Sequence, residues 1–242
     1  MRLDRLLANS GYGSRTTVKE MIRNGKVSIS CNIITDSGFQ VDDTMKGSIT
    51  VEGIGAIVRR YLHYVLNKPA GIITALEDPR HRTISDFIPG TLKTTGLFPV
   101  GRLDIDTTGL LLLTNDGTLC HRLASPKWHI PKTYYFELSG KYLDICDKNM
   151  LGQGIILSDG IKCKPASLDI LTSCSGMLTI TEGKYHQVKR MMKALGGTIT
   201  VLERKKMGPV ILDKDLLPGQ LRALTDEEID ALYQAVGMTG MK

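Results

Sequence analysis

Cysteine pairs, long apolar runs and an apolar leader are all missing from this sequence, and each absence excludes a class of protein. The five cysteines are scattered, and none lies in a Cys-x-x-Cys pair, so neither a disulfide framework nor a zinc site is indicated. The longest apolar stretch, around residues 110–113, is far shorter than the ~20 residues that cross a bilayer. The chain begins Met-Arg-Leu-Asp, and we therefore expect a cytoplasmic protein without a membrane or metal partner.

The composition is that of a globular protein with a basic character. Apolar residues make up 42% of the 242 residues and charged residues 23%, which allows one large domain, or a domain of ordinary size with a small accessory one. The net charge of +6 is compatible with a polyanionic partner and equally with a solvated basic surface. Positive residues are concentrated in residues 2–26 and again in residues 184–206.

Residues 14–25 predict a short helix with one cationic face. Ser14 can cap this helix, apolar residues within 18–22 form its buried side, and an Asn-Gly pair at 24–25 supplies a left-handed stop. Arg15, Lys19 and Arg23 are four residues apart, so three cations follow one face and could track a phosphate backbone. A charged helix face that is merely solvated is the alternative interpretation.

The flanking segments complete a small domain. Leucines within residues 3–7 indicate another short helix, and the alternation Val27, Ile29, Cys31, Ile33 predicts a strand with one buried face. Residues 42–55 are polar and contain glycine, and we expect them to lead into a linker near residues 58–61. The predicted boundary therefore gives a small domain over residues 1–60 and a larger one over residues 61–242.

The first segment resembles the S4 RNA-binding domain. The resemblance lies in residues 2–7 (RLDRLL), 13–15 (GSR) and 22–27 (IRNGKV). In that family the helix with these cations contacts structured RNA. The resemblance implies five candidate phosphate contacts: Arg5, Arg15, Lys19, Arg23 and Lys26.

The larger segment places a carboxylate on a loop beside a rigid strand. Gly101 and Gly109 bracket a polar loop that contains Arg102, Asp104 and Asp106, and the four leucines that follow predict a strand buried on both faces. Further strands are indicated at residues 62–66 and 131–138, and helices near residues 119–123, 188–195 and 225–236. Because strand pairs follow one another without intervening helices, we expect an α+β fold with a mainly antiparallel mixed sheet.

Five segments of the larger domain resemble the active-site motifs of the pseudouridine synthases. They are residues 68–71 (KPAG), 101–110 (GRLDIDTTGL), 132–134 (KTY), 182–191 (EGKYHQVKRM) and 217–222 (LPGQLR). With the first domain, the similarity covers nearly the whole chain. It is strongest to the branch that modifies small-subunit (16S) ribosomal RNA, the RsuA type, in which an S4 domain precedes this catalytic domain.

The resemblance implies a role for each of four site residues. Asp104 is expected to act on the sugar, by attack or by proton abstraction, and Lys189 to keep it charged. Tyr134 is expected to stack on the target base, and Arg102 to fill the space that a flipped nucleotide leaves. Asp106 is less constrained by its motif position. Further candidate RNA contacts are Lys68, Lys132, Lys184, His186 and Arg190.

The sequence thus predicts an isomerase that needs no cofactor and no metal. The expected partner is ribosomal RNA or a partly assembled small subunit, and the expected state is a monomer. The same chemistry on 23S ribosomal RNA is one alternative, although Tyr185-His186 favours the small subunit. An S4-type RNA-binding assembly factor without enzymatic activity is the other.

Overall fold

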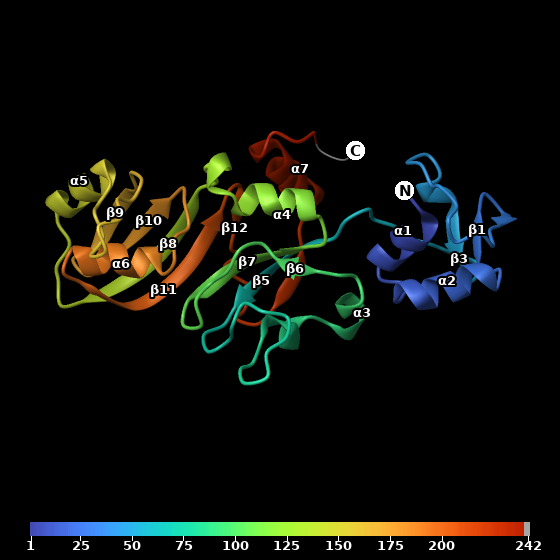
Figure 1. Cartoon of the computed structure of the whole chain (residues 1–242), viewed down its shortest axis with the longest axis horizontal. Coiled ribbons are helices and arrows are strands. Elements are labelled where there is room, and N and C mark those ends of the chain that lie inside the picture. The colour runs from blue at the N-terminus through green and yellow to red at the C-terminus, as the bar shows by residue number, and fades with distance from the viewer. Residues whose placement is uncertain (240–242) are drawn as a thin grey trace. The chain divides into compact units, whose positions relative to one another are not determined.

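A computed structural model describes residues 1–239. The chain divides into two compact units, which we describe separately (Figure 1). The first unit holds Met1–His63 with two short segments, Ile88–Phe98 and Thr114–Asp116, and the second unit holds the remainder. The last three residues of the expected catalytic domain lie outside the described range. Within that range no helix is both long and apolar enough to cross a membrane.

Two helices of the first unit form as the sequence predicts. Helix α1 (Leu3–Asn9) buries its leucines, and α2 (Arg15–Arg23) begins where the Ser14 side chain accepts a hydrogen bond from the Thr17 amide at 3.2 Å. Gly25 follows α2 with a φ of 68°, the left-handed conformation that ends a helix. Helix α3 (Gly90–Lys93) and the 3-10 turn η1 (Lys46–Ser48) complete the helical part of this unit.

The sheet of the first unit corrects the predicted single strand over residues 27–33. The order is β2-β1-β3-β4, with β1 (Val27–Ile29), β2 (Asn32–Ile33), β3 (Ile49–Val51) and β4 (Ile54–Gly55). Ser30 and Cys31 both have positive φ, 49° and 66°, as in the tight turn of a hairpin. The chain reverses there, so Ile33 is 67% exposed instead of buried. Residues 42–55, expected to lead toward a linker, supply half of this sheet.

The second unit is built on a large mixed sheet. Its main order is β13-β5-β7-β11-β8-β10-β9, and β12 and β6 pair at its margins with β11 and β7. The strands are β5 (His63–Lys68), β6 (Phe98–Pro99), β7 (Thr108–Thr114), β8 (Lys132–Ser139), β9 (Ser167–Thr172), β10 (Ser175–Ile180), β11 (Thr198–Met207), β12 (Val210–Ile211) and β13 (Leu221–Ala223). The β7–β11 pair is parallel, whereas β8 is antiparallel to both β10 and β11. The expected α+β class is confirmed.

Helices cover parts of this sheet and close its core. They are α4 (Gly117–Ala124), α5 (Ile145–Gln153), α6 (Gln187–Ala194) and α7 (Asp226–Ala235), with 3-10 turns η2 (Ile84–Phe87) and η3 (Pro126–Trp128). Figure 1 shows α5 and α6 beside the strands β8–β11, and α4 and α7 together beside β12. The four leucines of β7 are buried, and α7 begins at the predicted capping box of Thr225 and Glu228.

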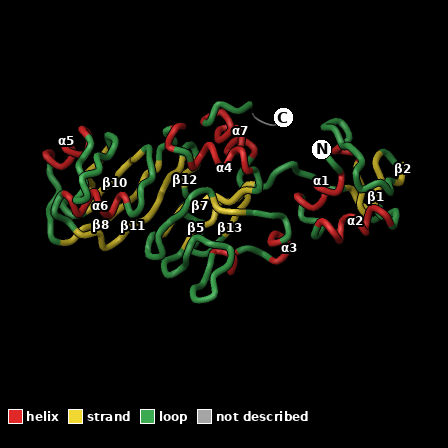
Figure 2. Tube along the Cα trace, viewed as in Figure 1, coloured by secondary structure: helices red, strands yellow, loops and turns green. Residues whose placement is uncertain are grey.

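Loops account for most of the chain between β5 and β7 (Figure 2). The final stretch of this segment is the Asp104 loop, residues 101–107, which leads directly into β7. A loop of this kind has little regular hydrogen bonding of its own, so its conformation depends on contacts from neighbouring elements. The position of its polar side chains is therefore set by those contacts.

Gly109, at the start of β7, allows two strand backbones to approach closely. Its φ is 96°, and a Cβ atom at this position would lie 2.4 Å from the carbonyl oxygen of Arg204 on β11. Because a backbone atom cannot move aside without breaking the β7–β11 pairing, we expect Gly109→Ala to lower the free energy of unfolding by about 2–4 kcal/mol. Urea denaturation measures this change.

Gly117→Ala is the matched control for Gly109→Ala. Gly117 is the first residue of α4, and a Cβ atom there would meet nothing within 4 Å. Its effect should stay within ~1 kcal/mol. A loss smaller than about 0.5 kcal/mol for Gly109→Ala would contradict the close approach.

Candidate active site

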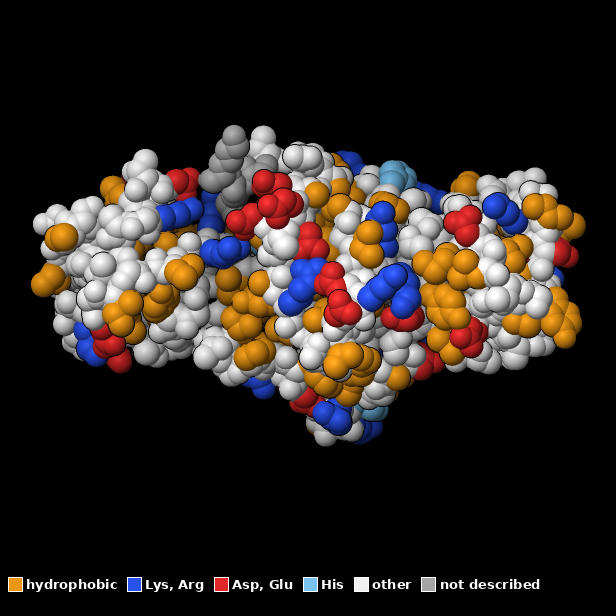
Figure 3. All heavy atoms as spheres, turned by 180° about the vertical axis from the view of Figure 1, so that it is seen from behind, with side chains coloured by type: hydrophobic (Ala, Val, Ile, Leu, Met, Phe, Trp, Pro, Cys, Tyr) orange, Lys and Arg blue, Asp and Glu red, His pale blue; other side chains and the backbone are white. Residues whose placement is uncertain are grey.

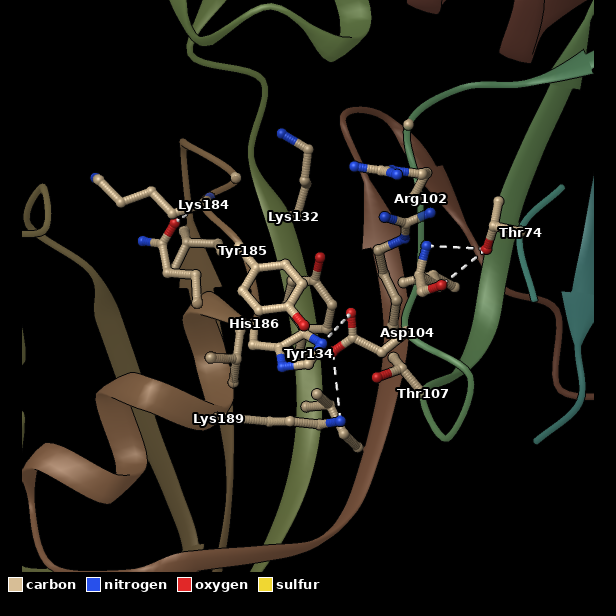
Figure 4. A pocket seen from close by; sticks show the side chains of 18 of the residues that line it. Thr74, Arg102, Asp104, Thr107, Lys132, Tyr134, Lys184, Tyr185, His186 and Lys189 are labelled. Atoms are coloured by element: carbon tan, nitrogen blue, oxygen red, sulfur yellow. Dashed lines mark hydrogen bonds and ion pairs between the residues drawn. The ribbon is translucent and has the colours of Figure 1, made fainter. Parts of the chain in front are cut away.

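A cavity of about 570 Å³ lies within the second unit. It is lined by the Asp104 loop, by β8 and β11, and by the segment that leads into α6 (Figure 4). Its size is in the range of pockets that hold a small ligand. The four residues expected to be catalytic, Asp104, Tyr134, Lys189 and Arg102, all line it, although they come from three separate sequence motifs.

The Asp104 carboxylate faces two basic side chains from the α6 region. Lys189 Nζ lies 3.3 Å from Asp104 Oδ2, and His186 Nε2 lies 3.4 Å from Asp104 Oδ1 (Figure 4). The second contact is an ion pair when the His186 ring is protonated. The Asp104 side chain is 29% exposed, so it is largely withdrawn from water but open to the cavity. The Lys189 ammonium and the Asp104 carboxylate attract each other in this partly buried site.

Lys189 is shared between two carboxylates. Its Nζ lies 2.5 Å from Asp106 Oδ1, and this hydrogen bond holds the pKa of Asp106 below its ordinary value. The Asp106 side chain is 65% exposed and does not line the cavity. Asp106 therefore helps to position Lys189 from the solvent side, while Asp104 meets the same ammonium from within the cavity.

The segment before α6 is held by a buried carboxylate. Glu182 accepts hydrogen bonds from Gln187 Nε2 at 2.7 Å and from the Lys164 amide at 3.0 Å, and it pairs with Lys184. Burial alone would raise the pKa of Glu182, but these hydrogen bonds and the Lys184 charge hold it below its ordinary value. His186 adopts a left-handed φ of 48° and stacks on Tyr185 with ring centroids 3.8 Å apart. The anchored turn thus directs His186 at Asp104.

Two side chains fix the conformation of the Asp104 loop. The ammonium of Lys68 donates to the carbonyl oxygens of Thr107 at 3.0 Å, Asp104 at 3.1 Å and Ile105 at 3.4 Å. The Thr74 hydroxyl donates to the Leu103 carbonyl at 2.8 Å and accepts from the Leu103 amide at 3.1 Å (Figure 4). The backbone on both sides of Asp104 is therefore held by hydrogen bonds from outside the loop.

Lys68 corrects a sequence prediction. It was expected to contact RNA, but its side chain is fully buried at the end of β5. Burial lowers the pKa of Lys68 to about 8, against the opposing influence of Asp106 and Asp104. The residue is a support of the loop and is not available to a phosphate.

Tyr134 lies on β8 with its side chain directed at the cavity. The strand alternates buried and half-buried residues, and Tyr134 pairs with Leu178 on β10 and Arg204 on β11. It is buried in the sheet but still lines the cavity. Figure 4 shows it beside the group formed by Asp104, His186 and Lys189.

The remaining residues of this unit that were predicted to bind RNA differ in how exposed their side chains are and in whether they already have partners. Arg102 is exposed, lines the cavity and makes no hydrogen bond or ion pair with any residue in the described range. Lys132 lines the cavity too but is buried, and burial together with the Arg204 charge lowers its pKa to about 8. Lys184 lines the cavity and pairs with Glu182. Arg190 does not line the cavity and pairs with Asp159. The expected role of Arg190 as a phosphate contact stays a prediction.

The predicted cations of the first unit are mostly free of acidic partners. Lys26 pairs with Glu52 at 2.7 Å. Over residues 1–239, no ion pair involves the other four, which are Arg5, Arg15, Lys19 and Arg23. On the face drawn in Figure 3, acidic and basic side chains are intermingled. That face therefore shows no uniform positive field.

Sequence reasoning missed several residues that shape the site. Thr74 lies outside the quoted motifs, and Thr107 lies within one but was given no role, although both line the cavity. Arg204 is a buried arginine within a run of charged residues on β11, so it looked like one of several surface cations. A run of three basic residues at 204–206 was visible in the sequence, but the direction of each side chain depends on a strand irregularity between Arg204 and Lys206.

Comparison with known proteins identifies the family. The model of the RNA pseudouridylate synthases matches residues 62–194, and that of the S4 domain matches residues 1–46. The chain belongs to the RNA pseudouridylate synthase family and carries an S4 domain at its N-terminal side. The resemblance inferred from the motifs is confirmed.

Individual relatives match over almost the entire chain. A Bacillus subtilis (strain 168) protein described as an uncharacterized RNA pseudouridine synthase, YtzG, is 47% identical over 97% of this chain and 99% of its own. The ribosomal small subunit pseudouridine synthase A of Escherichia coli (strain K12) is 37% identical over 95% of this chain and 98% of its own. A crystal structure of a pseudouridylate synthase superposes with a TM-score of 0.67 at 37% identity, covering 96% and 99% of the two chains.

Replacing Lys68 by methionine tests whether this residue supports the loop. The variant leaves three loop carbonyls without their donor, so we expect kcat to fall about 100-fold through misplacement of Asp104, while the Kd for RNA stays unchanged. Single-turnover kinetics and filter binding measure the two quantities.

Lys141→Met is the control for the loss of a partly buried lysine. Lys141 pairs with Asp147 at 3.0 Å and does not line the cavity, so kcat should be unaffected. If Lys68→Met instead weakened RNA binding and left kcat intact, Lys68 would be an RNA contact and the assignment here would be wrong.

Proposed function

We propose that this protein converts one specific uridine of 16S ribosomal RNA to pseudouridine, without a cofactor, and that Asp104 is the group that acts on the sugar. The substrate is suggested by relatives that are described as ribosomal small subunit pseudouridine synthases and match over nearly their whole length. The single observation that carries the catalytic assignment is the Asp104 carboxylate, held in the cavity between Lys189 and His186 and beside Tyr134.

The reaction requires one carboxylate near the sugar. The bond between uracil N1 and ribose C1′ breaks, and its electron pair stays with the ring. Asp104 either attacks C1′ to give an ester or removes the 2′ proton to give a glycal. The ring then turns and C5 bonds to C1′, as the ester bond to Asp104 breaks or as Asp104 returns the proton to C2′. The C5 proton is then lost and N1 takes up a proton. The product is an isomer of the substrate, so the atoms and electrons balance without any co-reactant.

The other cavity residues have distinct roles in this proposal. Lys189 keeps the Asp104 carboxylate ionised as RNA excludes water from the cavity. Tyr134 stacks on the uracil ring, since an aromatic face suits a base that has left its neighbours. Arg102, exposed and without a partner in the described range, fills the gap that the flipped nucleotide leaves in the RNA helix.

The S4 domain supplies RNA affinity in this proposal. We assign residues 1–60 to this domain and residues 61–242 to the catalytic domain. Phosphates of ribosomal RNA, free or in a partly assembled small subunit, bind the α2 cations Arg15, Lys19 and Arg23 and their neighbours Arg5 and Lys26. Contacts of this kind give affinity without reading sequence. The protein acts as a monomer, and the specificity for one uridine comes from the fold of the RNA.

Asp104→Asn separates the enzyme from its alternatives. In cells that lack the protein, one pseudouridine should disappear from 16S ribosomal RNA, and Asp104→Asn should fail to restore it, with a loss of activity of about 10⁴-fold or more. Asp169→Asn changes an exposed carboxylate outside the cavity lining and should restore the site. Pseudouridine mapping of ribosomal RNA reads out both variants.

Each contrary result has a definite meaning. A lost site in 23S ribosomal RNA would move the substrate to the large subunit and keep the chemistry. If no pseudouridine is lost, the protein is an RNA-binding assembly factor. Full restoration by Asp104→Asn would show that another group performs the reaction.

If the α2 cations contact phosphates, replacing them should weaken the salt dependence of RNA binding. Each of the changes Arg15→Gln, Lys19→Gln and Arg23→Gln should reduce the slope of log K against log salt by about 0.7–1, because one fewer counterion is released per lost phosphate contact. The exposed Lys214 on the second unit serves as the control. Unchanged slopes for all three variants would mean that this face is merely solvated.

A further inference from the structure

Arg204 is a buried cation without a buried anion. It lies on β11, its side chain is only 2% exposed, and its Nε donates to the Leu110 carbonyl at 2.7 Å. Its Nη2 has no hydrogen-bond partner among residues 1–239, and no carboxylate in that range pairs with it. Burying a guanidinium in this way is costly, and a native fold rarely leaves such a donor unused. The missing partner is therefore to be sought in a ligand.

The position of Arg204 places its side chain at the wall of the cavity. Arg204 lines the same cavity as Asp104 and lies directly opposite Tyr134 in the β8–β11 pairing. Residues opposite each other on neighbouring strands project to the same face of a sheet. Gly109, its neighbour on β7, carries no side chain that could intervene. A base stacked on Tyr134 would thus lie next to the Arg204 guanidinium.

The charges around the cavity are divided unevenly. Asp104 is already matched by Lys189 and His186. The charge of Arg204 contributes, after burial, to the lowered pKa of Lys132 and of Lys68, so two further basic side chains lie near it. This part of the cavity therefore carries positive charge that the protein does not neutralise. It is suited to a ligand that is negative, or becomes negative during reaction.

We propose that Arg204 binds the uracil ring after its release from the sugar and stabilises the negative charge on that ring. This inference rests on the proposed function. When the bond between N1 and C1′ breaks, the electron pair that remains on uracil is delocalised over N1, O2 and O4. The Arg204 guanidinium donates a hydrogen bond to one of these atoms, and the charge persists until C5 forms the new bond. The role is the same for both routes open to Asp104.

A backbone phosphate is a poorer candidate for this partner. Phosphates of a bound RNA remain at the cavity entrance, where exposed cations such as Arg102 are available. Arg204 is buried in the sheet and still lines the cavity. The ring oxygens and N1 of a flipped uracil are the acceptors that reach this depth.

A fluorine substituent on the target uracil tests whether Arg204 stabilises charge on the ring or only supports the fold. Fluorine at C5 withdraws electrons, so the 5-fluorouracil anion depends less on the enzyme for its stability. An RNA fragment with uridine or 5-fluorouridine at the mapped site would be consumed under single-turnover conditions by the wild type, Arg204→Gln, Arg204→Lys and Arg122→Gln. Loss of the starting nucleoside is followed by chromatography of digested RNA.

The expected result is a change in the ratio of the two rates. Arg204→Gln should consume uridine about 100-fold more slowly than the wild type, and its 5-fluorouridine to uridine rate ratio should rise about tenfold. Arg204→Lys keeps the charge and should stay closer to the wild-type ratio. Arg122 donates to the Val236 carbonyl away from the cavity, so Arg122→Gln should keep that ratio. Because each ratio is taken within one variant, partial loss of folded enzyme cancels.

Two contrary outcomes are distinguishable. If Arg204→Gln has the wild-type ratio, whatever its rate, Arg204 does not stabilise the ring and the proposed function still stands. If the wild type consumes neither RNA, the proposed function fails and this role fails with it.

Discussion

The site depends on one buried ammonium. Lys68 Nζ donates hydrogen bonds to the carbonyl oxygens of Asp104, Ile105 and Thr107. These three residues belong to a loop that has no regular secondary structure. With those oxygens directed at a common point, the loop has a fixed curvature, and the side chain of Asp104 is directed into the cavity. A charged donor is well suited to this task because hydrogen bonds to an ion are stronger than those between neutral groups. The catalytic assignment rests on this support, even though Lys68 itself has no access to substrate.

A division of charge follows from that geometry. At one part of the cavity, the Asp104 carboxylate meets Lys189 and His186, and Lys189 is itself held by Asp106. At another part, Arg204 and Lys132 are buried without a carboxylate partner in the described range. A polyanionic substrate with a base that becomes negative complements both parts. Under the two proposals above, the cavity stabilises a charge that appears during the reaction and is absent before it.

Patterns within a single element were predictable from the sequence. The Ser14 cap, the buried leucine strand and the Thr225 capping box depend on residues close in the chain, and each is confirmed. The strand expected over residues 27–33 was wrong because Ser30 and Cys31 take positive φ without a glycine. Alternation of apolar residues continues through such a turn, so periodicity alone cannot detect it.

Only those site residues that belong to recognisable sequence motifs were predictable. The motifs predicted Asp104, Tyr134 and Lys189 as site residues, and in the structure all three line one cavity. The contributions of Lys68 and Arg204 could not be inferred, because charge in a sequence does not reveal burial. Lys68 looked like a surface cation, and its role depends on a loop 36 residues further along the chain. Contacts across that distance arise from sheet pairing and loop packing, which local patterns do not encode.

The most direct test of this account is a crystal structure of Asp104→Asn bound to a 16S ribosomal RNA fragment that contains the mapped site. The account predicts a uridine flipped into the cavity, with its C1′ within about 3.5 Å of the side chain of residue 104 and its ring against Tyr134. A uridine that stays stacked in the RNA, or a sugar that lies on the far side of the cavity from residue 104, would contradict it.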